Sequence, residues 1–309
     1  MKSATSFPVF WRYSIETKYT VKDSKPVAER GGQIIAWVVL LFVLTVLGAL
    51  PFILGGLNLN QISSSTPHLP FILTGMLITA CAPTIAALLV AGFYPGAGGV
   101  RSVSRQMRTW RVGIAWYGGA LIGPIILFLL ADLIHVALGG APPAHWFVFR
   151  AMSGVGPGSL FWIVFGSLFA EELGWRGFAQ PRLQSRHGAL RASIFIGLIW
   201  STWHLWMVIT PGGFSLVTPE DAVATYIRLI STAIVYAWMY NSSKGSLFLV
   251  MVAHMGHNLG GSMVQTPSDG SHFHFTLAVL YLGAAIGVVL LTDWRTLTPR
   301  NPLISLRNG

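Results

Sequence analysis

The sequence predicts an all-α fold, a polytopic membrane helix bundle of about eight transmembrane helices, and three observations support this prediction. Hydrophobic residues make up 53% of the 309 residues and charged residues only 10%, whereas about a quarter of a typical soluble domain is charged. Several apolar runs approach or exceed the roughly 20 residues that a helix needs to cross a bilayer. The lysine and arginine residues gather in alternate loops between these runs, as membrane topology requires.

The predicted spans follow one another with short connections. They cover residues 34–54, 70–94, 113–138, 157–175, 192–210, 222–241, 246–264 and 275–292. Pro51, Pro83 and Pro124 fall inside spans, which a bundle tolerates because neighbouring helices satisfy the freed carbonyl groups. The sixth span is the weakest, because the charged Arg228 lies near its start.

The net charge of +10 has two explanations, a nucleic-acid partner or membrane topology. Eight spans place both termini on one side of the membrane, and every lysine and arginine except Arg150 and Arg228 then falls on that side. Positively charged loops stay in the cytoplasm. We therefore expect cytoplasmic N and C termini, the lipid bilayer as a partner and no nucleic acid. The short loops favour a multi-pass protein of the bacterial inner membrane over one of the endoplasmic reticulum.

Four segments divide the chain. Residues 1–33 form a cytoplasmic N-terminal segment, whose Phe7, Phe10, Trp11 and Ile15 could line one face of a short interfacial helix, with a disordered tail as the alternative. A cleavable signal would begin its apolar core sooner, so the first span is expected to be retained. Residues 34–154 hold the N-terminal transmembrane helices, 155–265 form the core with the polar motifs, and 266–309 hold the last transmembrane helix and a cytoplasmic tail.

Pairs of glycines at four-residue spacing are typical of closely packed membrane helices. The chain has three such pairs, which are Gly119 with Gly123, Gly256 with Gly260 and Gly283 with Gly287. We interpret them as packing between helices within the chain and not as evidence of dimerisation.

The most informative stretch is Phe161–Arg176, where an apolar run ends in two adjacent carboxylates, Glu171 and Glu172. An acidic side chain inside a spanning helix costs about 2.5 to 3.5 kcal/mol on insertion scales, so it normally faces the protein interior or a wet cavity and has a function. Residues four apart share a helix face, so Glu172 points with Arg176, whereas Glu171 is turned by about 100°. The two carboxylates therefore have different roles.

Two later spans carry the other polar residues. His204 lies in the fifth span, and His254, His257 and Asn258 lie in the seventh, where His254 and Asn258 share a face. The depths predicted for Glu171, His204 and His254 differ. They can converge only if the fourth helix continues beyond residue 175 or if the fifth helix tilts.

These residues resemble the three motifs of the CAAX protease and bacteriocin-processing family of intramembrane proteases. The motifs read Glu171-Glu172-x-x-x-Arg176, Trp200-x-x-x-His204 and His254-x-x-x-Asn258, and the resemblance covers about residues 155–265. Trp200 departs from the phenylalanine that is usual in the family. A residue that only packs against the site would tolerate this change.

The resemblance implies a role for each residue. Glu171 and His204 would hold and deprotonate a water molecule that attacks a peptide carbonyl, and His254 and Asn258 would stabilise the oxyanion. Glu172 would pair with Arg176 as structural support. General principles agree, because a carboxylate in an apolar site suits a general base, and an imidazole and an amide are suitable oxyanion donors.

A metal mechanism stays open from the sequence. Glu171, His204 and His254 make a set of two histidines and one glutamate that zinc enzymes also use, and the family has been described both with and without metal. We prefer no cofactor, with zinc as the alternative. The sequence contains no HExxH, GxGD or GxSG motif of other intramembrane hydrolases. His257 is expected to be structural, and Asp132 and His135 are expected to form a structural pair on the third span.

Two classes of function follow. The first is an intramembrane endopeptidase that hydrolyses a peptide or a membrane-anchored protein substrate with glutamate- and histidine-activated water. The alternative is a non-proteolytic scaffold, immunity factor or transporter that uses the same bundle. Buried glutamate and histidine are equally natural in a proton-coupled transporter, but the chain shows no recognisable pair of repeated halves.

Overall fold

The computed structural model describes residues 27–63, 65–94, 99–147, 163–210, 219–265 and 272–300. These residues form a helical bundle without strands, apart from two isolated bridges, which confirms the all-α fold. The surface helix predicted around Phe7 to Ile15 lies outside the described residues, as does most of the C-terminal tail. The first described helix begins at Val27, before the predicted boundary at residue 34.

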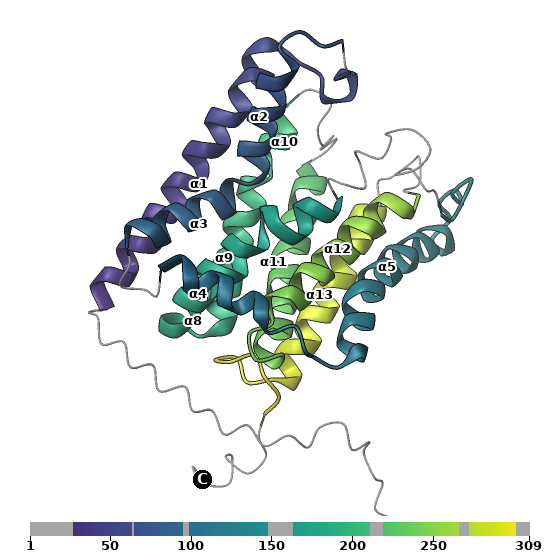
Figure 1. Ribbon diagram of the computed structural model, residues 1–309. Coiled ribbons are helices and arrows are strands. Elements are labelled where there is room, and N and C mark those ends of the chain that lie inside the picture. The colour runs from purple at the N-terminus through teal and green to yellow at the C-terminus, as the bar shows by residue number, and fades with distance from the viewer. Residues whose placement is uncertain are drawn as a thin grey trace, which may run out of the picture.

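The helices run in a single series along the chain (Figure 1). They are α1 (Val27–Gly55), η2 (Leu59–Gln61), α2 (Leu69–Ala80), α3 (Ala82–Phe93), α4 (Gly99–Arg105), η4 (Gln106–Arg108), α5 (Ile114–Ala137), η5 (Gly166–Ala170), η6 (Leu173–Ala179), α8 (Gln180–His187), α9 (Ala189–Trp203), α10 (Leu205–Ile209), α11 (Pro219–Ser242), α12 (Leu247–Met263) and α13 (Phe273–Leu291). Figure 1 shows α1, α2 and α3 on one side of the bundle, α5, α12 and α13 on the other, and α9 and α11 between them.

Among the described residues, five helices are long and apolar enough to cross a membrane, and the bent pair α2 and α3 makes a sixth if it counts as one span. The predicted count of eight is therefore not confirmed. The seventh predicted span corresponds to α12, which has only 17 residues. The fourth is interrupted at Glu171, between η5 and η6.

The second predicted span, residues 70–94, is two helices and not one. The axes of α2 and α3 differ by 69° across Cys81, and Pro83 lies in the first turn of α3. Proline has no N–H to donate and its ring clashes with the preceding turn, so it ends a helix but starts one easily. The Pro83 carbonyl accepts a hydrogen bond of 3.0 Å from the indole of Trp37 on α1. The bend thus brings α3 against α1 and, through Gly174, against η6.

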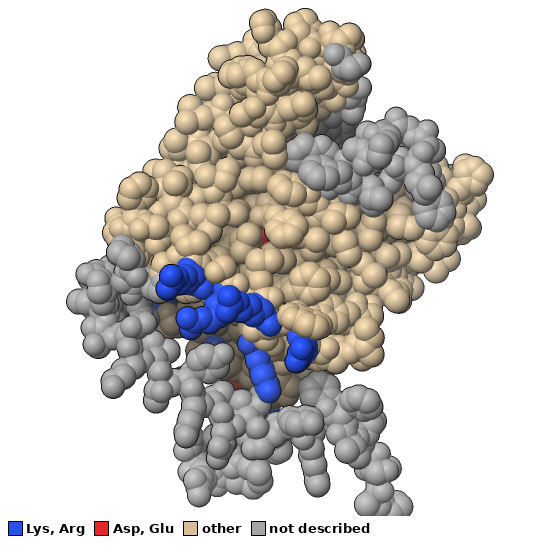
Figure 2. All heavy atoms as spheres, in the orientation of Figure 1, with Lys and Arg blue, Asp and Glu red and all other residues tan. Residues whose placement is uncertain are grey.

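Basic side chains gather at one end of the bundle. Figure 2 shows Lys and Arg along a band of the surface at the end where α4 and α8 lie in Figure 1. Arg101 and Arg105 of α4, Arg108 of η4 and Arg111 beyond it are all exposed. A basic band at one end of an apolar bundle is what the positive-inside rule leads one to expect at the cytoplasmic face.

Only one of the three glycine pairs lies at a close helix contact. A Cβ at Gly256 of α12 would stand 2.5 Å from the Leu121 carbonyl oxygen of α5, and one at Gly260 would stand 2.7 Å from the Phe128 ring. The other two pairs have open space within 4 Å in the described structure. The packing prediction is therefore right for Gly256 and Gly260 and wrong for the pairs on α5 and α13.

Gly256→Ala is expected to destabilise the protein by about 1 to 3 kcal/mol, because a methyl group there collides with the backbone of α5 and the two helices must separate. The matched control is Gly119→Ala on α5, whose added methyl meets nothing within 4 Å. Thermal unfolding of both variants in detergent measures the difference. An equal melting temperature for Gly256→Ala and wild type would contradict the close contact.

Candidate active site

The backbone around the first motif is wide and irregular. η5 and η6 are π-helical turns, and between them Glu171 adopts φ −120° and ψ −52°. Wide turns of this kind are frequent at functional sites. They turn both carboxylates inward, so that Glu171 is only 9% exposed and Glu172 is fully buried. The helical path then continues through η6 and α8 to His187, beyond the predicted end at residue 175.

Glu172 is held by two partners. Nη1 of Arg176 donates to Oε1 at 3.0 Å and to Oε2 at 3.1 Å, and both side chains are fully buried. Nδ1 of His254, on α12, lies 2.9 Å from the same Oε1. A buried charge is tolerated only when it is paired and hydrogen-bonded. Glu172 therefore connects the first motif to the third.

Glu171 has different partners. Its Oε2 accepts hydrogen bonds from the indole N–H groups of Trp200, at 2.8 Å, and Trp175, at 3.2 Å. Its Oε1 lies 3.9 Å from Nε2 of His254. This distance is too long for a direct hydrogen bond. The two oxygens of Glu171 thus differ: one is occupied by indoles and the other faces an imidazole.

His254 lies between the two glutamates. It is 3% exposed, with Nδ1 toward Glu172 and Nε2 toward Glu171. A carboxylate only accepts hydrogen bonds, so Nδ1 carries the proton in this contact. Its ring packs edge-on against Trp200, with centroids 5.5 Å apart, and lies beside Tyr236 of α11.

His204 ends α9 and meets the site through Trp200. Nδ1 of His204 lies 2.9 Å from the Trp200 carbonyl oxygen, so this nitrogen is the donor. The ring centroid lies 5.9 Å from that of Trp200 and 4.8 Å from that of Trp203. All three motifs therefore converge on one aromatic side chain.

Asn258 lies one turn beyond His254 on α12. Its amide Nδ2 donates to Oγ of Ser167 at 2.9 Å, and Ser167 in turn donates to the Ile163 carbonyl. Ser167 lies four residues before Glu171. Two hydrogen bonds thus connect α12 with the first-motif segment. Asn258 bonds to Ser167 of η5, and His254 bonds to Glu172 beyond the end of η5.

Sequence reasoning missed three contributors. It considered only packing against the site for Trp200, as a condition under which the change from phenylalanine would matter little, whereas the indole donates a hydrogen bond to Glu171. It gave no role in the site to Trp175 or Ser167, although both lie four residues from Glu171. Arg176 was expected to meet Glu172 only. Its guanidinium also lies over the rings of Trp200, at 4.8 Å, and Tyr236, at 5.0 Å, where cation–π attraction adds to the ion pair.

The zinc alternative requires at least three protein ligands at about 2.0 to 2.3 Å from the ion. No three His, Cys, Asp or Glu side chains come together as a metal-binding group in the part of the chain that the structure describes. The predicted alternative set of Glu171, His204 and His254 is therefore not arranged as a ligand set here.

A second polar cluster lies next to the site. His257 bonds to Tyr281 of α13 through Nδ1, at 2.6 Å, and to Arg228 of α11 through Nε2, at 3.4 Å. These bonds join three helices, which agrees with the structural role expected of His257. Asp132 and His135 are both buried, but neither oxygen of Asp132 has a hydrogen-bond partner. The expected Asp132–His135 pair therefore does not form a hydrogen bond.

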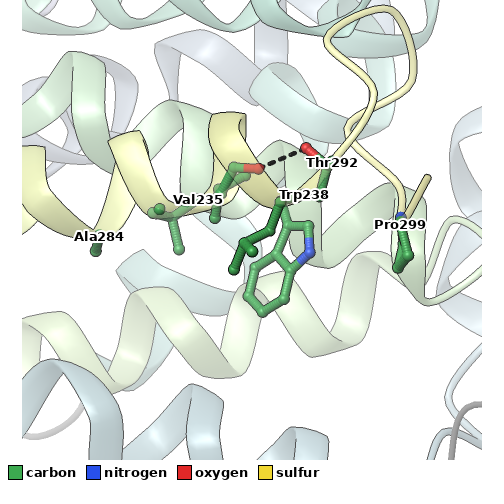
Figure 3. A pocket seen from close by; sticks show the side chains of 8 residues that line it. Val235, Trp238, Ala284, Thr292 and Pro299 are labelled. Atoms are coloured by element: carbon green, nitrogen blue, oxygen red, sulfur yellow. Dashed lines mark hydrogen bonds between the residues drawn. The ribbon is translucent and has the colours of Figure 1, made fainter.

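An apolar cavity of about 550 Å³ lies between α11 and α13, away from the polar residues (Figure 3). Val235, Trp238, Ala284 and Thr292 line it, and none of the residues of the three motifs does. A surface this apolar offers no group that could polarise a peptide bond. The chemistry of the protein is therefore to be sought at the glutamates.

The fold and the site define a class of protein, a helical membrane protein with a buried cluster of glutamate, histidine, arginine and tryptophan. Residues 153–260 match the family model described as type II CAAX prenyl endopeptidase Rce1-like. The chain is also 28% identical over 179 residues to CAAX prenyl protease 2 of Methanococcus maripaludis, a match that spans 56% of this chain and 64% of that protein. Both comparisons agree with the resemblance of the three motifs to the CAAX protease and bacteriocin-processing family.

Proposed function

We propose that the protein is an intramembrane endopeptidase in which Glu171 activates the attacking water. One observation carries the proposal: of two adjacent buried glutamates, Glu172 is neutralised by Arg176, whereas Oε1 of Glu171 faces Nε2 of His254 at 3.9 Å. A neutralised carboxylate is a poor base, so Glu171 is the one available for proton transfer. This gap is wide enough for a bridging polar group and too wide for a direct bond.

The proposed reaction uses these groups in sequence. Oε1 of Glu171 takes a proton from water, and the oxygen attacks the peptide carbonyl carbon. His204 helps to orient the water. The oxyanion is stabilised by the Asn258 amide and by Nε2 of His254 when this ring carries both protons. Collapse of the intermediate breaks the C–N bond, and the proton held by Glu171 passes to the leaving nitrogen. The products are a carboxylate and an amine.

The substrate class follows from the surroundings of the site. The names of the family and of the archaeal relative refer to CAAX prenyl proteins. For this chain we propose a peptide or membrane-anchored protein substrate, which reaches glutamates buried in a bundle that itself lies in the bilayer. Nothing in this proposal requires the substrate to carry a prenyl group.

Hydrolysis can be tested directly with purified protein in liposomes. The assay uses two internally quenched peptides of the same sequence, one farnesylated and one not, in water enriched in oxygen-18. We expect cleavage of at least one peptide, with one heavy oxygen in the new carboxyl group by mass spectrometry. Failure to cleave either peptide, combined with a cellular phenotype that survives both Glu171→Ala and His204→Ala, would favour the non-proteolytic scaffold, immunity factor or transporter.

Chelation provides a separate prediction. Dialysis against 1,10-phenanthroline and re-assay in metal-free buffer are expected to leave kcat/KM within about twofold of the untreated protein, because the proposed base is a carboxylate that needs no Lewis acid. Activity is measured before dialysis, after dialysis and after addition of Zn²⁺. A loss on dialysis that Zn²⁺ restores would establish a metal mechanism and contradict this one.

A further inference from the structure

Trp200 contacts a member of every motif. Its indole N–H donates to Oε2 of Glu171 at 2.8 Å, and its ring lies against His254 and His204. The guanidinium of Arg176 lies 4.8 Å from its ring centroid. The side chain is 2% exposed, so water does not compete for these contacts. His254 and Tyr236 of α11 also contact members of all three motifs, but among these three side chains only Trp200 donates a hydrogen bond to Glu171.

The indole N–H allows Trp200 to donate a hydrogen bond to Glu171, in addition to the contacts that its ring makes. An indole nitrogen only donates, and a carboxylate oxygen only accepts, so the bond has one direction. Phenylalanine would supply the same apolar surface to His254 and His204 but would leave Oε2 without this donor. Trp175 donates to the same oxygen at 3.2 Å. Two donors on Oε2 leave Oε1 as the oxygen that faces His254.

We propose that Trp200, assisted by Trp175, is a positioning residue that holds Oε2 of Glu171 so that Oε1 is the atom that accepts the proton of water. The proposal rests on the function proposed above. It assigns Trp200 no contact with substrate. It differs from a packing role because it depends on the N–H group and not on the ring.

The test compares Trp200→Phe with Trp203→Phe in the full-length protein. Trp203 is equally buried in the same aromatic cluster, but its indole donates to Thr45 at 2.9 Å and not to Glu171. For Trp200→Phe we expect kcat to fall on the order of tenfold with KM unchanged, since a hydrogen bond to a charged group is lost. Trp203→Phe should keep the wild-type kcat, because it leaves both indole donors to Oε2 of Glu171 in place.

The outcomes separate this inference from the proposed function. If Glu171→Gln abolishes cleavage but Trp200→Phe keeps the kcat of wild type, Trp200 only packs and the inference is wrong. If Glu171→Gln remains active, the proposed function fails first. Trp175→Phe should produce a smaller change in the same direction, because its bond is longer.

A spectroscopic measurement keeps the test decisive if Trp200→Phe does not fold. The protein is labelled with ¹⁵N-indole tryptophan, and Trp175→Phe and Trp203→Phe help to assign the indole resonances. The Trp200 N–H resonance should shift in Glu171→Gln, which changes the acceptor and leaves the ring environment intact. A Trp200 resonance that is the same in wild type and Glu171→Gln would overturn the hydrogen bond on which the inference depends.

Discussion

Glu171→Gln is expected to lower kcat by about 10² to 10⁴-fold, the range that general-base catalysis contributes, while the protein remains folded. Glutamine has nearly the same shape, and its carbonyl oxygen can still accept the indole N–H of Trp200. Its amide cannot take a proton from water. The measurement is kcat for a quenched peptide in liposomes, with melting temperature recorded in parallel.

The control for this prediction is Glu220→Gln, an exposed glutamate in the first turn of α11. It removes one negative charge from the chain without touching the site, so kcat should stay at the wild-type value. Full activity in Glu171→Gln would show that this carboxylate is not the base. A loss of activity accompanied by an equally large loss of stability would be attributed to folding, and the assignment of the base would then be withdrawn.

Arg176→Met is expected to destabilise the protein by about 3 to 5 kcal/mol, because it leaves the fully buried Glu172 carboxylate without its cation. Both side chains are 0% exposed, so water cannot compensate. Methionine keeps an unbranched side chain of similar length, which limits the change in packing against Trp200 and Tyr236. Thermal unfolding in detergent measures the loss, and a lower yield of folded protein is expected with it.

The double variant Glu172→Gln/Arg176→Met separates charge from packing. Removing both charges should recover a large part of the stability that Arg176→Met loses, since no unpaired ion remains. Arg105→Met, an exposed arginine on α4, serves as the control and should melt like wild type. If Arg176→Met also melted like wild type, the ion pair would not support the first motif.

Much of this architecture could be predicted from local patterns. The apolar runs predicted helices because length and composition are properties of a short segment. The four-residue spacing placed Glu172 with Arg176, and His254 with Asn258, on common helix faces. The prediction was less successful where distant segments compete with local preference. The chain breaks at Cys81, α12 is short, and a Cβ at any of the paired glycines of α5 and α13 would meet nothing within 4 Å.

For the candidate site too, the sequence predicted the residues but not the contacts between them. Its members could be selected from the sequence, because charged and polar residues are rare in apolar runs and these fall in three spaced groups. Their contacts could not be selected, because Trp200 and Glu171 are 29 positions apart and His254 and Glu172 are 82 apart. The role of Trp200 is the clearest case. Its spacing from His204 made it part of the second motif but gave its N–H no partner, and only the approach of α9 to the first motif places this N–H on a carboxylate.

The sequence by itself determined that the chain is an apolar helical bundle and which side chains bring charge and hydrogen-bonding groups into it. Composition and helical spacing suffice for this, because both act over a few residues. Only the tertiary structure decided that Glu172 also meets Nδ1 of His254 and that Oε1 of Glu171 faces Nε2 of the same ring. The physical reason is that the wide turns of η5 and η6 direct two neighbouring carboxylates into the interior, and the helices packed around them then supply different partners to each.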